Sequence, residues 1–176
     1  MRPLSDSSGT EGDAEAAGQM LQLAAQQLGR FDAWALVAFI RCAAAFKGAL
    51  SQASLAAWQH ALEALLQELT PHGVSNVLLM LGTLADADRQ LSRAMDVGLT
   101  ARLLERAVGL ASSMNAQGAA NTLYGAALLR LQVNGAHFAA LLDTVLGSLP
   151  EVSAQGLTQV LLACQKLMDT AEHQRK

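Results

Sequence analysis

The sequence predicts an all-α protein, more specifically a right-handed α-solenoid of stacked helical hairpins. Hydrophobic residues make up 52% of the 176 residues and charged residues 15%, a mixture typical of a chain that buries a core. Aromatic residues account for only 4% and only three prolines occur, which favours helices over strands. A helical segment that recurs four times indicates that the helices form a tandem array.

The recurring segment occupies residues 31–46, 69–84, 114–129 and 152–167, and its four copies align without gaps. Its apolar positions follow the spacing i, i+3, i+4, i+7 and i+10, which places them on one face of an α-helix. Thr122 is the only polar residue in this stripe. The stripe consists of Leu36, Phe39, Ile40, Ala43, Phe46, Val74, Val77, Leu78, Leu81, Leu84, Ala119, Thr122, Leu123, Ala126, Leu129, Leu157, Val160, Leu161, Cys164 and Leu167.

Each copy also carries an N-cap residue at the same register, directly before the predicted helix. The four N-cap residues are Asp32, Thr70, Asn115 and Ser153. They lie 38, 45 and 38 residues apart, so the repeat has a period of 38 residues with one longer unit. Pro71 occupies the first helical position of the second copy, where proline is favoured. The extra residues of the longer unit fall around 85–98, and we expect them to form a surface loop.

A second amphipathic helix is predicted in each complete unit, over residues 51–69, 99–114 and 135–149. Each unit is therefore predicted to be a helical hairpin, with Trp58 in the core. The chain ends soon after the first helix of a fourth unit. We therefore expect either a fragment of a longer array or an end that docks onto another surface.

The two ends of the chain differ in composition from the repeat domain, which is predicted over residues 19–170. Residues 1–18 hold four acidic residues and one basic residue among Ser, Gly and Thr, and are predicted to be a disordered acidic tail. Residues 171–176 are predicted to be a polar C-terminal end. The formal net charge of -3 resides in the tail, because the remaining chain carries 11 acidic and 11 basic residues. A neutral body is unusual for a protein that binds nucleic acid, which commonly shows a basic excess.

Targeting and membrane signals are not visible in the sequence. The acidic tail has neither the apolar core of a signal peptide nor the Arg-rich character of a transit peptide. Charged or amide residues interrupt every apolar run before it is long enough to cross a bilayer. We therefore expect no membrane partner.

Small and amide residues recur beside the apolar stripe, and they carry a resemblance to a known family. They are Gly73, Gly118 and Gly156, followed three positions later by Asn76, Asn121 and Gln159. With the two-helix unit of 38 residues, this pattern resembles the octotricopeptide repeat of organellar RNA-handling proteins of green algae, and the repeats that precede RAP domains in related proteins. The resemblance covers about residues 30–168. It implies a modular, sequence-selective single-stranded RNA-binding protein of a chloroplast or mitochondrion that acts in RNA processing, stability or translation.

Polar residues opposite the stripe are the first candidates for RNA contact. They form successive i, i+4 pairs on the side of the first helices that is expected to be exposed. The pairs are Trp34 and Ala38, His72 and Asn76, Gln117 and Asn121, and Gln155 and Gln159. An amide carries a donor and an acceptor with which to read a base edge. The alternative is that these amides bridge neighbouring helices or cap backbone groups.

Basic and aromatic residues of the same helices complete the candidate interface. Tyr124 and Trp34 are able to stack on bases, although such residues more often belong to a core. Scattered basic residues more often form a solvated surface than a binding site. The basic residues are Arg41, Lys47, Arg130 and Lys166.

Catalytic and metal-binding motifs are not found in the sequence, so we expect no enzyme activity, no cofactor and no metal. The four histidines are far apart, and Asp86 with Asp88 is better explained as part of a solvated loop than as a cation site. Cys42 and Cys164 are expected to be small buried thiols rather than a disulfide or a metal site.

Two hypotheses of different class therefore stand. The first is a single-stranded RNA-binding repeat module, and the second is a protein–protein interaction scaffold of the HEAT or armadillo kind that uses the same concave face. Convergence of the amides with the basic residues in one groove would favour RNA. An exposed apolar patch would favour a protein partner.

Overall fold

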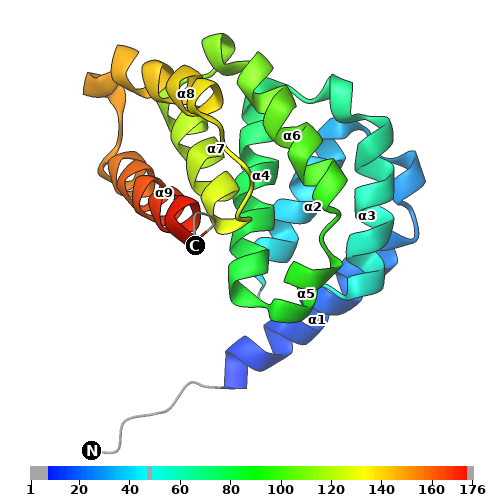
Figure 1. Ribbon diagram of the computed structural model, residues 1–176. Helices are drawn as coiled ribbons and strands as arrows, with labels where there is room; N and C mark the ends of the chain where they lie inside the picture. The colour runs from blue at the N-terminus through cyan, green and yellow to red at the C-terminus, as the bar shows by residue number, and fades with distance from the viewer. Residues whose placement is uncertain (1–7, 47–48, 174–176) are drawn as a thin grey trace, which may run out of the picture.

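The computed structural model describes residues 8–46 and 49–173, and within these ranges it contains helices and no strands, which confirms the all-α class. Helices α2, α4, α7 and α9 correspond to the first helices of the four units, and α3, α6 and α8 to the second helices (Figure 1). No described helix has the length and apolarity that crossing a membrane requires. The α-helices are α1 (Ser8–Ala25), α2 (Ala33–Ala45), α3 (Gln52–Ala64), α4 (Pro71–Ala87), α5 (Arg89–Ala94), α6 (Val97–Gly109), α7 (Ala116–Leu128), α8 (Gly135–Gly147) and α9 (Ala154–His173).

The junction between successive units has the same construction each time. A 3-10 helix of three residues follows each second helix and leads into the next first helix; these are η2 (Leu66–Glu68), η3 (Ala111–Ser113) and η4 (Leu149–Glu151). Helix α1 is followed by η1 (Leu28–Arg30) in the same way, and α3 packs against η1 as α6 packs against η2 and α8 against η3. Helix α1 therefore occupies the place of a second helix.

The four expected N-caps are all confirmed. The side chains of Asp32, Thr70 and Asn115 each accept a hydrogen bond from the backbone N–H three residues later, over 2.8, 3.1 and 2.8 Å. Ser153 accepts the equivalent bond over 3.0 Å. Each such cap stabilises a helix by about 1 kcal/mol because it satisfies a backbone donor that has no partner within the helix. Local sequence signals thus fix where the first helices begin.

The first helices pack side by side in chain order, α2 against α4, α4 against α7 and α7 against α9 (Figure 1). At the contact between α4 and α7, glycines stand where the two backbones meet. A Cβ atom added to Gly125 would lie 2.5 Å from the backbone carbon and oxygen of Leu78, and one added to Gly82 would lie 2.9 Å from the carbonyl oxygen of Gly125. The two backbones therefore touch where larger residues would hold them apart.

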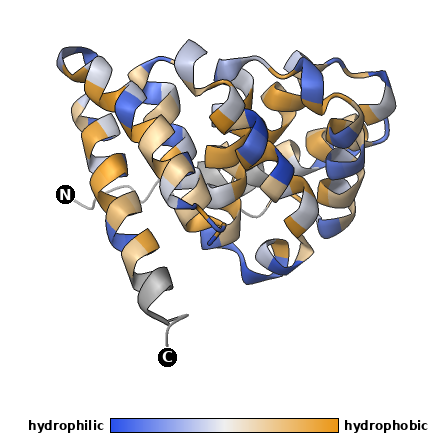
Figure 2. Cartoon of the chain, turned by 45° about the horizontal axis from the view of Figure 1, so that its top comes forward, coloured by the Kyte–Doolittle hydropathy of each residue, from blue (hydrophilic) through white to orange (hydrophobic). Residues whose placement is uncertain are grey.

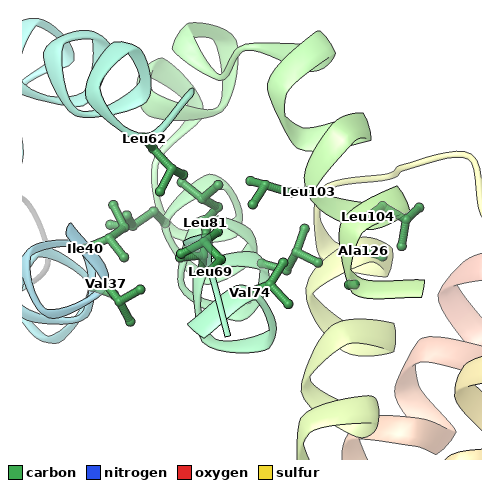
Figure 3. Close-up of a cluster of buried hydrophobic side chains, with 14 of the residues drawn as sticks. Val37, Ile40, Leu62, Leu69, Val74, Leu81, Leu103, Leu104 and Ala126 are labelled. Carbon is green, nitrogen blue, oxygen red and sulfur yellow. The ribbon is translucent and has the colours of Figure 1, made fainter. Parts of the chain in front are cut away.

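The core lies between the first and second helices. Figure 3 shows Ile40, Leu62, Leu81, Leu103 and Ala126 converging from α2, α3, α4, α6 and α7, and all five are fully buried. The expected stripe is buried in the first three units except for Phe46 and Leu129 at its ends.

Trp58 belongs to this core as expected. Its side chain is fully buried, and its indole N–H donates a 2.8 Å hydrogen bond to the carbonyl oxygen of Leu36. The bond joins α3 to α2 and satisfies the one polar atom that the indole brings into the core.

The N-terminal prediction is wrong for residues 8–18, since helix α1 begins at Ser8 rather than after a disordered tail. Residues 1–7 lie outside the described ones. Ala17 and Leu21, four residues apart on one helix face, are 8% and 4% exposed, and Leu21 joins the main hydrophobic cluster. Burial of this face stabilises the helix, although the composition of the segment alone suggests a disordered tail.

The expected loop around 85–98 is also wrong. Helix α4 continues to Ala87, and the short helix α5 follows, with the carboxylate of Asp88 accepting from the backbone N–H groups of Gln90 and Leu91. Leu91 is only 2% exposed, and α5 packs against α3 and α4. The insertion therefore extends the core instead of projecting from it.

Gln59 of α3 holds the end of this insertion in place through two side-chain hydrogen bonds. Its amide N–H donates to the carbonyl oxygen of Ala94 over 3.1 Å, and its amide oxygen accepts from the backbone N–H of Asp96 over 2.7 Å. The side chain is mostly buried, so both of its polar ends find partners away from water.

Both cysteines are free thiols, but their surroundings differ from the expected burial. Cys42 is exposed on α2 and Cys164 is half-buried on α9. Cys42 is exposed because no first helix covers that side of α2 among the described residues.

Candidate functional site

The i, i+4 pairs divide into one exposed row and one buried row. The first members, Trp34, His72, Gln117 and Gln155, stand at the same register of α2, α4, α7 and α9. Trp34 is 78% exposed, His72 and Gln155 are exposed, and Gln117 is half-buried. We call these four side chains the register row. Each first helix thus presents one side chain of the row, and the helices that carry them lie next to one another.

The second members of the pairs are buried, against the expectation that both members face solvent. Asn76, Asn121 and Gln159 are 8%, 9% and 6% exposed, and Ala38 in the first unit is half-buried. The three amides lie on the side of each first helix that faces the first helix of the preceding unit. Burial of an amide is costly unless it is hydrogen-bonded, so their partners decide what they do.

Two of the buried amides hold members of the register row. The amide nitrogen of Asn76 lies 2.9 Å from Nε2 of His72, and that of Gln117 donates to the side-chain oxygen of Asn121 over 2.9 Å. Which of the two groups donates in this bond depends on the tautomer of His72. In α4 and α7 a buried amide one turn away therefore fixes the orientation of the side chain in the row.

Gln117 also bridges α7 and α9. Its amide nitrogen donates to the side-chain oxygen of Gln159 over 2.9 Å, and its oxygen accepts from the hydroxyl of Ser153 over 2.8 Å. This is the bridging role that the sequence left open as the alternative for these amides. Bridging and an exposed surface position coexist in Gln117, since the side chain is half-buried.

The basic candidates are not brought together with the register row. Arg41 is exposed on α2 seven residues beyond Trp34, which is about 10 Å along the helix. Arg130 is exposed just past the end of α7 with a φ of 55°, and Lys166 is half-buried near the C-terminal part of α9. Lys47 lies outside the described residues. The convergence of amides with basic residues that would favour RNA is therefore not observed among the described residues, and the row holds no lysine, arginine or carboxylate.

Tyr124 does not lie with the row either. It stands seven residues beyond Gln117 on α7, is half-buried, and packs against the hydrophobic core. This position matches the alternative expectation that the aromatic residue is part of the core.

A hollow of about 290 Å³ lies beside the row, between the first turns of α4 and α7. Its lining residues are Thr70, Pro71, His72, Ser113, Met114, Asn115 and Gly118. The N-terminal ends of two neighbouring helices, which carry partial positive charge, flank this hollow. His72 is the member of the row that lines this hollow.

Sequence reasoning missed an apolar groove between α1 and α2. The groove measures about 710 Å³ and is lined almost entirely by alanine and larger apolar residues. A signal was present, because the first unit has Ala35 and Ala38 where the other units have glycine and an amide. Among the described residues, no group of three or more His, Cys, Asp or Glu side chains is placed to hold a metal ion.

Comparison with known proteins adds no relative: no family model, no curated protein and no solved structure matches the chain significantly. What the structure defines is an all-α protein of helical-repeat-like construction.

Proposed function

We propose that the protein is a single-stranded RNA-binding repeat module in which each side chain of the register row contacts one nucleotide. The observation that carries this proposal is the row itself, one exposed side chain at the same register of each first helix, with two members oriented by a buried amide. The proposed architecture is a right-handed α-solenoid with a 38-residue period, and the row follows one edge of it. Other helical repeats that bind single-stranded RNA also take one base per repeat.

The chemistry of the row suits contact with bases more than with phosphates. Gln155 offers donors and an acceptor for a base edge, Gln117 keeps one free acceptor position on its amide oxygen, and the indole of Trp34 offers a flat surface on which a base can stack. The hollow between the starts of α4 and α7 supports a phosphate contact at His72, because helix N-termini favour anions. The resemblance to the octotricopeptide repeat points to the same class of ligand. It also suggests a chloroplast or mitochondrial role in RNA processing, stability or translation.

The experiment is fluorescence anisotropy of the purified chain with labelled random single-stranded RNA at several salt concentrations. The row holds no lysine or arginine, so we expect weak, saturable binding with a shallow salt dependence. One or two phosphate contacts correspond to a log–log slope of about -0.7 to -1.4.

The variant pair Gln155→Ala and Gln132→Ala locates the binding surface. Both glutamines are exposed, but only Gln155 belongs to the row. We expect Gln155→Ala to weaken binding and Gln132→Ala to leave it unchanged. Equal affinities for the two variants, or no binding at tens of micromolar protein, roughly the range of non-specific contacts, would refute the proposal.

A protein-interaction scaffold of the HEAT or armadillo kind is the second candidate, and a separate observation favours it. Exposed apolar side chains gather at the two ends of the described array, Met20 and Trp34 beside the α1–α2 groove and Leu157 and Leu161 on α9. Exposed apolar patches of this kind mark surfaces that bind protein partners. Absence of RNA binding together with capture of a helical partner at these ends would support the scaffold.

A further inference from the structure

The two ends of the described array lack opposite parts of a helical hairpin. Helix α1 stands in the place of a second helix, yet no first helix pairs with it among the described residues. Helix α9 is a first helix, and no described second helix covers it. Figure 1 shows α1 and α9 at opposite ends of the molecule.

The α1–α2 groove lies where the first helix of a preceding unit would pack. On α2 the groove is lined by Ala35, Ala38 and Cys42, whose equivalents in α7 are Gly118, Asn121 and Gly125. The equivalents in α7 are buried, because α4 packs against them, whereas Cys42 is exposed. On α1 the groove is lined by Met20, Leu21 and Ala24 among others. A first helix laid against both α1 and α2 would bury the groove in the way that α4 buries the face of α7.

Helix α9 has the face that such a helix would need. Leu157 and Leu161 are 42% and 71% exposed, although their equivalents Leu36, Ile40, Val74, Leu78, Ala119 and Leu123 are all fully buried. In the first three units these positions are covered by the second helix of the hairpin and by the next first helix. Figure 2 shows the apolar residues along the outer helix that leads to the C-terminus. Leu146 and Leu149, beside α9 in the chain, are 54% and 46% exposed as well.

We propose that copies of this chain associate head to tail, with α9 of one copy seated in the α1–α2 groove of the next. In this arrangement α9 and the neighbouring copy's α1 form the hairpin that each lacks alone. Helix α2 of that copy then follows as the next first helix, so the sequence of first and second helices runs unbroken from one copy into the other. The α1 end has no first helix beside it, and α9 is a first helix. The α9 end has no second helix beside it, and α1 stands in the place of a second helix. A second copy therefore fits both surfaces.

The contacts inside the chain specify the register of this interface. Gly125 meets the backbone of Leu78 in the α4–α7 contact. At the equivalent registers, Cys42 of one copy lies opposite Leu161 of its neighbour, and the two helices stand farther apart there than α4 and α7, because Cys42 carries a side chain where Gly125 has none. The two surfaces differ from each other, so the contact is heterologous and leaves a free groove and a free α9 at the ends of any assembly. Assembly then grows with concentration instead of stopping at a symmetric dimer.

Sedimentation velocity of the 176-residue chain from micromolar to roughly millimolar protein, the weak limit for specific contacts, tests this proposal. We expect the average mass to rise above the 18.4 kDa of one chain. Leu161→Glu blocks α9 and Cys42→Glu blocks the groove, and each variant alone is expected to stay monomeric. Both residues are exposed, so neither change disturbs the core. The control is Val97→Glu, at a residue that is 75% exposed on α6, and it should assemble like the unchanged chain.

An equimolar mixture of the two blocked variants separates a heterologous contact from a symmetric one. The Leu161→Glu chain retains its groove and the Cys42→Glu chain retains its α9, so the mixture is expected to form a dimer of one chain of each kind and nothing larger. A monomeric unchanged chain, assembly that persists in Leu161→Glu, or a mixture that fails to form the dimer would each overturn the proposal.

A disulfide trap tests the register. Leu161→Cys, combined with Cys164→Ser, should become linked to Cys42 of a neighbouring copy under mild oxidation with diamide, because the two cysteines would stand at the registers of Leu78 and Gly125, which meet in the α4–α7 contact. Ala136→Cys in the same background, at an exposed residue of α8, should not form this link. Equal linkage of the two introduced cysteines would overturn the register. The outcome does not depend on RNA, because the assays contain none.

Discussion

The glycine contact between α4 and α7 provides a sharp test of the packing. In Gly125→Ala the new methyl carbon would lie 2.5 Å from the backbone of Leu78, where ordinary contact begins at 3.4 Å. Helix α7 must therefore move away by up to about 0.9 Å, and a gap of this size forfeits roughly a quarter to a half of the dispersion energy across the contact. Overpacking of a core costs about 1–3 kcal/mol, and backbone atoms cannot rotate aside to reduce it.

The helix propensity of alanine offsets part of this cost. Replacing glycine by alanine inside a helix is favourable by about 1 kcal/mol. We therefore expect Gly125→Ala to lower the free energy of unfolding by up to about 2 kcal/mol, and the thermal midpoint by up to roughly 8 °C for a chain of this size. Circular dichroism at 222 nm during heating and urea titration measures both quantities.

A matched glycine shows whether the effect comes from the contact. A Cβ atom added to Gly147, at the end of α8, meets nothing within 4 Å, so Gly147→Ala should leave the thermal midpoint unchanged or raise it slightly. If Gly125→Ala proved as stable as Gly147→Ala, the described approach of α4 to α7 would be wrong.

Three further changes test other contacts, each by denaturation with urea unless stated. Trp58→Phe removes the indole N–H and leaves the carbonyl of Leu36 without its buried donor, so we expect a loss of about 1–3 kcal/mol, and no loss would contradict the bond. Asn115→Ala removes the N-cap of α7 and should cost about 1 kcal/mol, most of which Asn115→Ser should restore. Gln59→Ala releases the end of the insertion, so amide hydrogen exchange should rise in α5 and stay unchanged in α7; uniform exchange would show that Gln59 does not anchor α5.

Features that depend on a few neighbouring residues were predictable from the sequence. The N-caps and the apolar stripe follow from side chains within one helix turn of each other, and the structure confirms both in the first three units. The predicted core position of Trp58 is also confirmed, because a large residue on the apolar face of an amphipathic helix is buried when that helix packs.

Features that depend on distant residues were not predictable in the same way. The burial of Asn76 and Asn121 is decided by how closely the preceding first helix approaches, which for Asn121 depends on Gly82 of α4 and Gly125 of α7. The sequence predicts a disordered tail over the start of helix α1, because the residues there are small or acidic. Their helical state accompanies the burial of Leu21 in the main core. The alignment with the other units predicts Leu161 in the core, but no described helix packs over it and its side chain is exposed.

The hydrogen bonds of Gln117 have a mechanical consequence. Apolar side chains tolerate a small sliding of one helix along another, whereas an amide that donates to Gln159 and accepts from Ser153 loses both bonds on sliding by even one residue, about 1.5 Å. The α7–α9 joint is therefore stiff against shear. Between α2 and α4 the register of Gln117 holds Trp34, whose side chain is exposed, and Asn76, at the register of Gln159, bonds within its own helix, so bending of the molecule under load should concentrate at that N-terminal joint.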